Sequence, residues 1–283
     1  MLFASREARK RNNKRAETKT LSGLWQKTKR DFGRGMKDMG KHALLVPSAA
    51  YRWLKCTRAP RLEATLPKKP SVFADEGTLA HKVCEITARQ YFKQIDGKEF
   101  SRKLKELKAD PLWNDEMVDT AIQYAKYLRK QAGKYSAYPH IEFEKKVDVS
   151  EYVPDVFGRC DCVMLGADTL IIIDYKHGKG APVSAEQNPQ MMLYALGALG
   201  LWPDRKKQIR NVKTCIVQPR IGSFDGWKCS IKKLIQWGES IKVTAQMAYE
   251  GKGEFNPGSW CRFCLAYGIC EATKMDGEDA IND

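Results

Sequence analysis

The chain has 283 residues, of which 43% are hydrophobic and 29% charged, a composition ordinary for a globular protein. Its longest apolar run covers the 12 residues 191–202, whereas a membrane-spanning helix needs about 20. Basic residues follow the first five positions with no apolar segment after them, which excludes a secretory signal. The nine cysteines are too few for a disulfide scaffold. We therefore expect a cytoplasmic protein with reduced thiols and no membrane partner.

The N-terminal segment is strongly basic. Residues 1–42 hold 13 lysines and arginines and four acidic residues, which accounts for +9 of the net charge of +15. Such a segment favours polyanions, because neutralising phosphates releases condensed counterions; a solvated tail without a specific partner is the alternative. Apolar residues between Leu21 and Met39 fall roughly on one helical stripe. We assign residues 1–45 to a basic, flexible N-terminal arm.

Residues 46–271 are predicted to form one domain of helices, then strands, then helices. The arrangement is typical of an α/β fold in which a mixed β-sheet is flanked by helices, with a helical N-terminal part and a C-terminal cysteine cluster. Residues 272–283 form an acidic tail. The pattern predicts helices at 48–55, 78–93, 101–108, 114–132, 188–200 and 232–249, a loop at 60–70, and strands at 141–149, 158–165, 170–176, 212–218 and 226–231.

Two acidic residues and a lysine stand on neighbouring predicted strands. Asp174 and Lys176 end a strand that is apolar before them, and alternation places both on one face. Asp161 lies in the preceding strand, on the face opposite Cys160 and Cys162 by the same rule. The carboxylates would hold a hard divalent cation and the lysine would orient or activate a water. A surface ion pair at a strand end is the alternative.

Two predicted helices add polar pairs that lie one turn apart. Gln190 and Tyr194 share one face of the helix after the lysine strand, and His81 and Glu85 share one face of an earlier helix. Each pair alone is more commonly a structural or solvated contact. Together with the strand residues, they form four polar constellations in a fixed order along the chain.

In this order the motifs resemble those of the RecB-type members of the PD-(D/E)XK nuclease superfamily. The resemblance covers about residues 46–271 and implies a restriction-endonuclease-like core. The matching positions are His81 in the first helix, Gly158-x-x-Asp161 as the second motif, Asp174-Tyr175-Lys176 as the (D/E)XK motif and Gln190-x-x-x-Tyr194 as the QxxxY motif.

The resemblance also implies a role for each matching residue. Pro154-Asp155 is a literal PD pair that competes for the second motif; we favour the later aspartate because it lies inside a predicted strand. Glu85 is a candidate additional carboxylate. The implied roles are coordination of Mg²⁺ or Mn²⁺ by His81, Asp161, Asp174 and the Tyr175 backbone carbonyl, positioning of the nucleophilic water by Lys176, and contact with DNA or bracing of the site by Gln190 and Tyr194.

Three cysteines near the C-terminal end, Cys261, Cys264 and Cys270, have the spacing C-x2-C-x5-C, which resembles a metal half-site. A subset of RecB-like nucleases carries one cysteine before the nuclease motifs and three after them, all binding a [4Fe-4S] cluster. The resemblance implies this cluster for Cys56 and the three later cysteines; Zn²⁺ and reduced structural thiols are the alternatives. The remaining cysteines are expected to be buried hydrophobic residues: Cys84, Cys160, Cys162, Cys215 and Cys229.

The sequence therefore predicts a metal-dependent DNA exonuclease that acts at duplex ends. The chain is similar to a group of phage-encoded RecB-like nucleases, which implies phage recombination in the host cytoplasm beside a single-strand annealing protein. Cleavage from 5′ to 3′ would leave the overhang that such a partner needs. A homo-oligomer would enforce processivity. The alternatives are an end-trimming nuclease of CRISPR-adaptation type, a non-catalytic DNA-binding module on the same fold, and a structural protein held by zinc.

Overall fold

The computed structural model describes residues 43–67 and 70–275. Predictions made for the arm up to residue 42 and for the tail beyond residue 275 lie outside these residues. In the described part of the chain, no helix is both long enough and apolar enough to cross a membrane.

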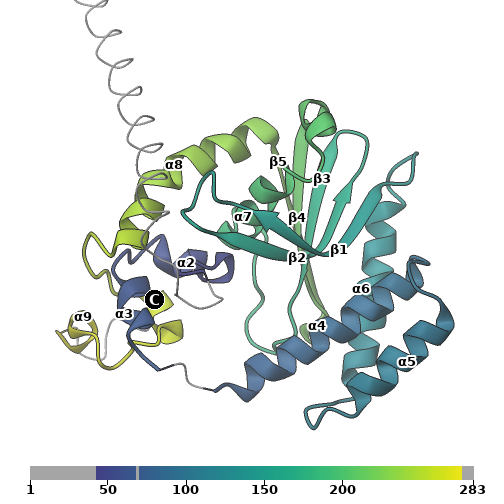
Figure 1. The fold of residues 1–283 in the computed structure, drawn as a ribbon, viewed down its shortest axis with the longest axis horizontal. Helices are drawn as coiled ribbons and strands as arrows, with labels where there is room; N and C mark the ends of the chain where they lie inside the picture. The colour runs from purple at the N-terminus through teal and green to yellow at the C-terminus, as the bar shows by residue number, and fades with distance from the viewer. Residues whose placement is uncertain (1–42, 68–69, 276–283) are drawn as a thin grey trace, which may run out of the picture. The chain divides into compact units, whose positions relative to one another are not determined.

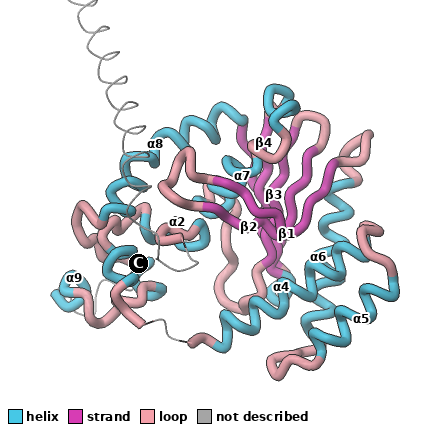
Figure 2. Tube along the Cα trace, viewed as in Figure 1, coloured by secondary structure: helices cyan, strands magenta, loops and turns pink. Residues whose placement is uncertain are grey.

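A five-stranded mixed sheet forms the centre of the domain, with its strands in the order β1-β2-β3-β4-β5 (Figure 2). Neighbouring strands run antiparallel except β3 and β4, which are parallel. Every residue of β3 is buried, as expected for a central strand covered on both faces. The strands are β1 (His140–Asp148), β2 (Phe157–Leu165), β3 (Thr169–Tyr175), β4 (Asn211–Gln218) and β5 (Ser223–Ser230).

Helices cover both faces of the sheet, which confirms the predicted α/β class (Figure 1). One face packs against α4 (Val72–Tyr91) and α6 (Glu116–Ala132), with α5 (Gly97–Lys108) beside them. The other face packs against α2 (Ala50–Trp53), α7 (Pro189–Ala198) and α8 (Ile231–Glu250). The connections are completed by α3 (Ala59–Ala64), α9 (Glu271–Met275) and the short 3-10 helices η1 (Pro47–Ala49), η2 (Pro203–Gln208), η3 (Pro219–Ile221) and η4 (Ser259–Phe263).

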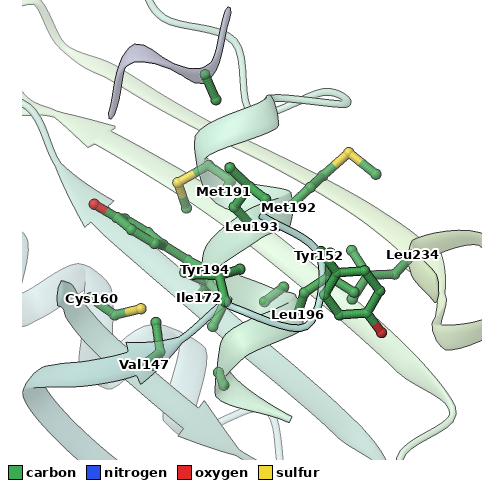
Figure 3. Close-up of a cluster of buried hydrophobic side chains, with 14 of the residues drawn as sticks. Val147, Tyr152, Cys160, Ile172, Met191, Met192, Leu193, Tyr194, Leu196 and Leu234 are labelled. Carbon is green, nitrogen blue, oxygen red and sulfur yellow. The ribbon is translucent and has the colours of Figure 1, made fainter. Parts of the chain in front are cut away.

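Helix α7 lies at the centre of one apolar cluster (Figure 3). Its N-cap Asn188 accepts a hydrogen bond from the backbone N–H of Met191, and Pro189 occupies the first turn, as predicted. All residues from Met191 to Ala198 are buried, so the helix is apolar on every side. This burial fixes the helix against the sheet and thereby places Gln190 beside Asp174 of β3 and Tyr194 against Gly158 of β2.

Three helical predictions need correction. Helix α5 begins at Gly97 and not at residue 101, because the Asp96 side chain accepts the N–H of Glu99. The predicted loop at 60–70 contains α3, because Pro60 stands in the first helical turn, where its missing N–H costs no hydrogen bond. Helix α4 begins at Val72, six residues before the predicted start, because the Ser71 side chain accepts the N–H of Ala74 and caps the earlier turn. The earlier start brings residues 72–77 close to the end of β3.

The face presented by β2 changes part-way along the strand. Cys160 packs in the cluster under α7, whereas Cys162 packs in the cluster under α4 and α6. The prediction that both thiols share one face is therefore wrong. Strict alternation fails at Asp161, where the pairing between β2 and β3 has already ended. All five cysteines predicted to be buried are buried.

Candidate active site

Asp161 stands where β2 and β3 part. The paired residues end at Cys162 and Ile173, and Asp161 Oδ2 then accepts the backbone N–H of Tyr175 at 2.7 Å. The carboxylate thus takes the hydrogen bond that a strand carbonyl would otherwise accept, which holds the side chain at the fork. The other oxygen, Oδ1, lies 3.1 Å from Nδ1 of His81 on α4.

Glu144 on β1 joins this pair. One ligand atom each from His81, Glu144 and Asp161 lies within 4.8 Å of the other two, and no other such group of three occurs among residues 43–67 and 70–275. Each of the three side chains is half-buried. An imidazole and two carboxylates form a donor set suited to a divalent cation such as Mn²⁺.

The backbone of β1 aims Glu144 at the other two ligands. Glu144 has a left-handed φ of 50°, a conformation that costs a residue other than glycine about 1–2 kcal/mol. It lies between the pairs Phe143–Cys162 and Lys145–Cys160, directly opposite the aspartate of β2. Phe143 and Val147 consequently belong to opposite apolar clusters. Sequence reasoning missed Glu144 because alternation gives no sign of a left-handed residue inside a strand.

The charges in this group favour an added cation. Burial raises the pKa of Glu144 to about 7, and the nearby Asp161 and Glu85 carboxylates add to the shift. Burial alone would lower the pKa of His81, but Asp161, Asp174 and Glu144 outweigh it and raise the pKa to about 9. Neighbouring carboxylates contribute to both shifts, and an added cation would offset the repulsion between them.

Asp174 enters a second set of contacts with Lys176 and Gln190. Gln190 Nε2 donates to Asp174 Oδ1 at 3.1 Å, and Lys176 Nζ donates to Gln190 Oε1 at 3.0 Å. Asp174 Oδ2 is buried and lies 2.9 Å from Lys176 Nζ as an ion pair, but it accepts no well-aligned hydrogen bond from the described residues. Burial raises the pKa of Asp174 although the lysine opposes this effect.

Tyr194 braces the amide of Gln190. Its hydroxyl accepts a hydrogen bond from Gln190 Nε2 at 3.2 Å, so the two residues meet one helical turn apart as predicted. The ring lies against Gly158 of β2, where an added Cβ would stand 2.5 Å from Tyr194 Cε1. The glycine of the Gly158-x-x-Asp161 motif therefore leaves the room that the tyrosine occupies.

Two other candidate carboxylates lie outside these contacts. Glu85 Oε1 forms an ion pair with Arg89 at 2.8 Å, and Glu85 is not part of the group of three ligands. Asp155 has a φ of 53° in the turn between β1 and β2, where its carboxylate accepts the hydroxyl of Tyr249 at 2.6 Å. These contacts favour Asp161 over the literal PD pair.

A cleft of about 420 Å³ opens beside His81 and Lys176. It lies between the first turns of α4 and the loop that follows β3. Its lining includes two lysines, one arginine and one carboxylate. The lining residues are Phe73, Ala74, Glu76, Gly77, Thr78, His81, Lys176, His177, Gly178, Lys179 and Arg220.

A chain of hydrogen bonds anchors the wall of this cleft. Burial lowers the pKa of His177, and the contact with Glu76 opposes this shift. Nε2 of the ring lies 3.0 Å from both Glu76 Oε1 and Arg220 Nη1, and Nδ1 lies 2.9 Å from the Tyr175 hydroxyl, which donates to Thr120 at 2.9 Å. Arg220 also donates to Glu76 of α4 at 3.3 Å. The end of β3 is thereby tied to both α4 and α6.

The four cysteines predicted as cluster ligands line one cavity. Cys56 comes from the segment between α2 and α3, whereas Cys261, Cys264 and Cys270 come from the segment around η4. No three of these sulfurs lie within 4.8 Å of one another. The backbone N–H of Asn256 points to Cys56 Sγ and that of Gly258 to Cys261 Sγ, both at 3.4 Å.

The two segments that carry these cysteines lie side by side (Figure 1), and polar contacts join them. Arg52 donates to the carbonyl of Phe263 at 2.9 Å and to Glu63 Oε2 at 2.9 Å. Glu63 Oε1 in turn accepts the backbone N–H of Leu265 at 2.8 Å. Segments about 200 residues apart in the chain are therefore closed against each other by direct protein contacts.

Comparison with protein-family models identifies the family of the chain. A family model described as "Protein of unknown function (DUF2800)" matches residues 42–281. The chain belongs to this family. A solved structure titled "Crystal structure of SSO0001" matches at 14% identity over 79% of this chain and 96% of that chain, with a TM-score of 0.32. This similarity is too weak to support an argument about function.

In this DUF2800 family member, the predicted site residues divide into two adjoining groups. His81 and Asp161 meet Glu144, which the sequence did not predict, whereas Asp174 meets Lys176 and Gln190. The backbone N–H of Tyr175 links the groups through its bond to Asp161. The predicted role of the Tyr175 carbonyl as a metal ligand stays a prediction.

Proposed function

We propose that the chain is a metal-dependent deoxyribonuclease of RecB-like PD-(D/E)XK type that hydrolyses phosphodiester bonds at the ends of duplex DNA. The observation that carries the proposal is the meeting of His81, Glu144 and Asp161 next to Lys176 at a basic cleft. A phosphodiester substrate needs such a combination, because negative charge develops on its oxygens during hydrolysis. Phage recombination and a single-strand annealing partner stay predictions.

The residues present suit Mg²⁺ or Mn²⁺. Carboxylate oxygens are the preferred ligands of both ions, and an imidazole suits the softer Mn²⁺. The carboxylates around His81 and Glu144 favour an added positive charge, and Asp174 adds a buried oxygen that accepts no hydrogen bond within the part of the chain that the structure describes. His81, Glu144 and Asp161 would hold the ion, with Asp174 as a further ligand. A bound ion would stabilise charge on the phosphate and lower the pKa of a coordinated water.

Lys176 would orient the attacking water and the phosphate. An ammonium group has three N–H donors; one is directed to Gln190, and the amine is ion-paired with Asp174. The remaining donor capacity is available to a water or a phosphate oxygen. Gln190, held by Tyr194, fixes both partners of this ion pair and so keeps the amine in one position.

For the four cysteines we propose a [4Fe-4S] cluster rather than Zn²⁺. A tetrahedral zinc site with bonds of about 2.3 Å places its sulfurs about 3.8 Å apart. No three of the four sulfurs lie within 4.8 Å of each other although all line one cavity, which favours a larger group. Backbone N–H groups directed at Cys56 and Cys261 are contacts that stabilise cluster thiolates and tune their potential.

Cleavage of a labelled linear duplex beside its covalently closed circular counterpart tests the proposed activity. We expect loss of the linear DNA alone in Mg²⁺ or Mn²⁺ and no loss in EDTA, because an exonuclease needs a free end and a cation. Cleavage of the circle at an equal rate would indicate an endonuclease. Cleavage of neither form by protein with its metal content verified would favour a non-catalytic DNA-binding module.

Replacing Glu144 by glycine should raise the melting temperature in EDTA but reduce the further rise that Mn²⁺ produces. In EDTA we expect a higher melting temperature, because glycine removes the left-handed strain of about 1–2 kcal/mol and the repulsion between Glu144 and Asp161. With added Mn²⁺ we expect a smaller rise in melting temperature than for the parent, because one ligand is lost. Calorimetry across a Mn²⁺ titration measures both effects.

Lys93→Gly provides the matched control. Lys93 follows α4 with a φ of 58°, so its replacement also relieves a left-handed residue, but far along the helix from the three ligands. We expect Lys93→Gly to raise the melting temperature and leave the Mn²⁺ response unchanged. A Glu144→Gly protein that responds to Mn²⁺ as strongly as the parent would remove Glu144 from the proposed ligand set.

A further inference from the structure

An aromatic ring stands exposed at the rim of the cleft beside His81 and Lys176. Phe73 lines the cleft and is 85% exposed, an unusual degree of exposure for a phenylalanine. The helical turn that carries it is anchored, because Ser71 caps the first turn of α4 and Glu76 pairs with Arg220. The ring therefore projects from an anchored helical turn.

Cationic side chains gather beside this ring. Lys176, Lys179 and Arg220 line the cleft together with one carboxylate, Glu76, while Glu116 pairs with Arg220 at 2.8 Å from outside the lining. Lys179 is largely exposed, and its amine forms an ion pair with Glu116 at 3.2 Å, which a phosphate can replace. Exposed aromatic rings beside basic side chains are the combination that binds unpaired nucleotides, because bases stack on the ring while phosphates meet the cations.

The size of the cleft suits an unpaired DNA strand and not a duplex. About 420 Å³ lies within the range of roughly 300–1,000 Å³ that holds a small organic ligand, which is room for about one nucleotide and not for base-paired DNA. The cleft also opens directly onto the three ligands through His81 and onto the ion pair through Lys176. A nucleotide in it would place its phosphate next to the proposed catalytic residues.

We propose that this cleft binds the unpaired terminal nucleotide of a DNA strand, with Phe73 stacking on the base and Lys179 and Arg220 meeting the backbone phosphate. The inference rests on the proposed nuclease function and deepens it. Its substrates are duplexes with an unpaired or frayed end, and Phe73 sets that preference.

Binding of two labelled duplexes tests the proposal, one blunt and one carrying a short unpaired end at either its 5′ or its 3′ terminus. Fluorescence anisotropy is measured with Ca²⁺ in place of Mg²⁺ for the parent and for Phe73→Ala, Phe73→Trp and Val72→Ala. Val72 is the matched control, because it precedes Phe73 and is 63% exposed but does not line the cleft.

For Phe73→Ala we expect affinity for the unpaired end to fall roughly tenfold, the usual scale of a lost base–aromatic stack, with little change for the blunt duplex. Phe73→Trp should retain the preference and Val72→Ala should match the parent. Phe73→Ala binding both duplexes as the parent does, or losing both equally, would overturn the proposal.

Cleavage of the same duplexes in Mn²⁺ separates this inference from the proposed function. A parent protein that cleaves no DNA but shows binding dependent on Phe73 would overturn the nuclease and support the cleft assignment. A parent protein that cleaves DNA, with a Phe73→Ala variant that cleaves and binds both duplexes equally well, would overturn the cleft assignment alone.

Discussion

Replacing Lys176 by alanine is expected to lower the rate of DNA cleavage roughly 100- to 1,000-fold, the scale on which losing one positioned donor in an active site acts. Lys176 is the amine that contacts both Asp174 and Gln190, and it faces the cleft that would receive the phosphate. DNA affinity, measured with Ca²⁺, should change far less, because Lys179 and Arg220 remain. Single-turnover cleavage of an end-labelled duplex measures the loss.

Two further variants test whether a loss of cleavage comes from misfolding and not from the loss of the amine. Lys176→Ala leaves Asp174 buried without its ion pair, which is destabilising, so its melting temperature is compared with that of a Lys176→Ala, Asp174→Asn double variant that removes the unpaired charge. Lys145→Ala is the matched control, because Lys145 is a sheet lysine paired only with Glu142 at 3.2 Å. Cleavage by Lys176→Ala at the parent rate would contradict the role proposed for Lys176.

Replacing Cys261 by serine should destabilise the protein by about 5 kcal/mol, the loop-closure entropy for a cross-link between Cys56 and Cys261, which are 205 residues apart. The cavity lined by the four cysteines is the place where such a cross-link would form. We also expect the visible absorbance and the bound iron of the purified protein to be lost. Denaturant unfolding and elemental analysis measure these two quantities.

Cys229→Ser is the control for that experiment. Cys229 is also a buried thiol, but it lies on β5 and does not line the cavity. Its replacement should leave metal content unchanged and cost only the local burial of a small side chain. Zinc in place of iron in the parent would replace the proposed cluster by a zinc site, and the same metal content in Cys261→Ser would contradict ligation by Cys261.

Local periodicity was sufficient to predict the parts of the site that follow simple geometry. Alternation along β3 places Asp174 and Lys176 on one face, and their side chains meet. The i,i+4 spacing on α7 brings Gln190 to Tyr194. The mixed sheet and its flanking helices follow from the same patterns, because strongly apolar segments have few alternative ways to be buried.

The features that the sequence did not predict depend on departures from periodicity. The left-handed φ of Glu144 and the change of face on either side of Asp161 each break the two-residue repeat. Both depend on how the strands pair with one another. A glutamate or an aspartate in a strand sequence gives no sign of either departure. Cys160 and Cys162 were assigned to one face for the same reason, because alternation was carried through a fork in the sheet.

The position of Cys56 relative to its three predicted partners has a consequence for how the protein is made. Ribosomes add about 5–20 residues per second, so the 205 residues between Cys56 and Cys261 take about 10–40 s to synthesise. The sheet and the candidate site residues emerge during that interval, before the far wall of the cysteine cavity exists. A metal that needs all four thiols can therefore be loaded only after the whole sheet has been synthesised.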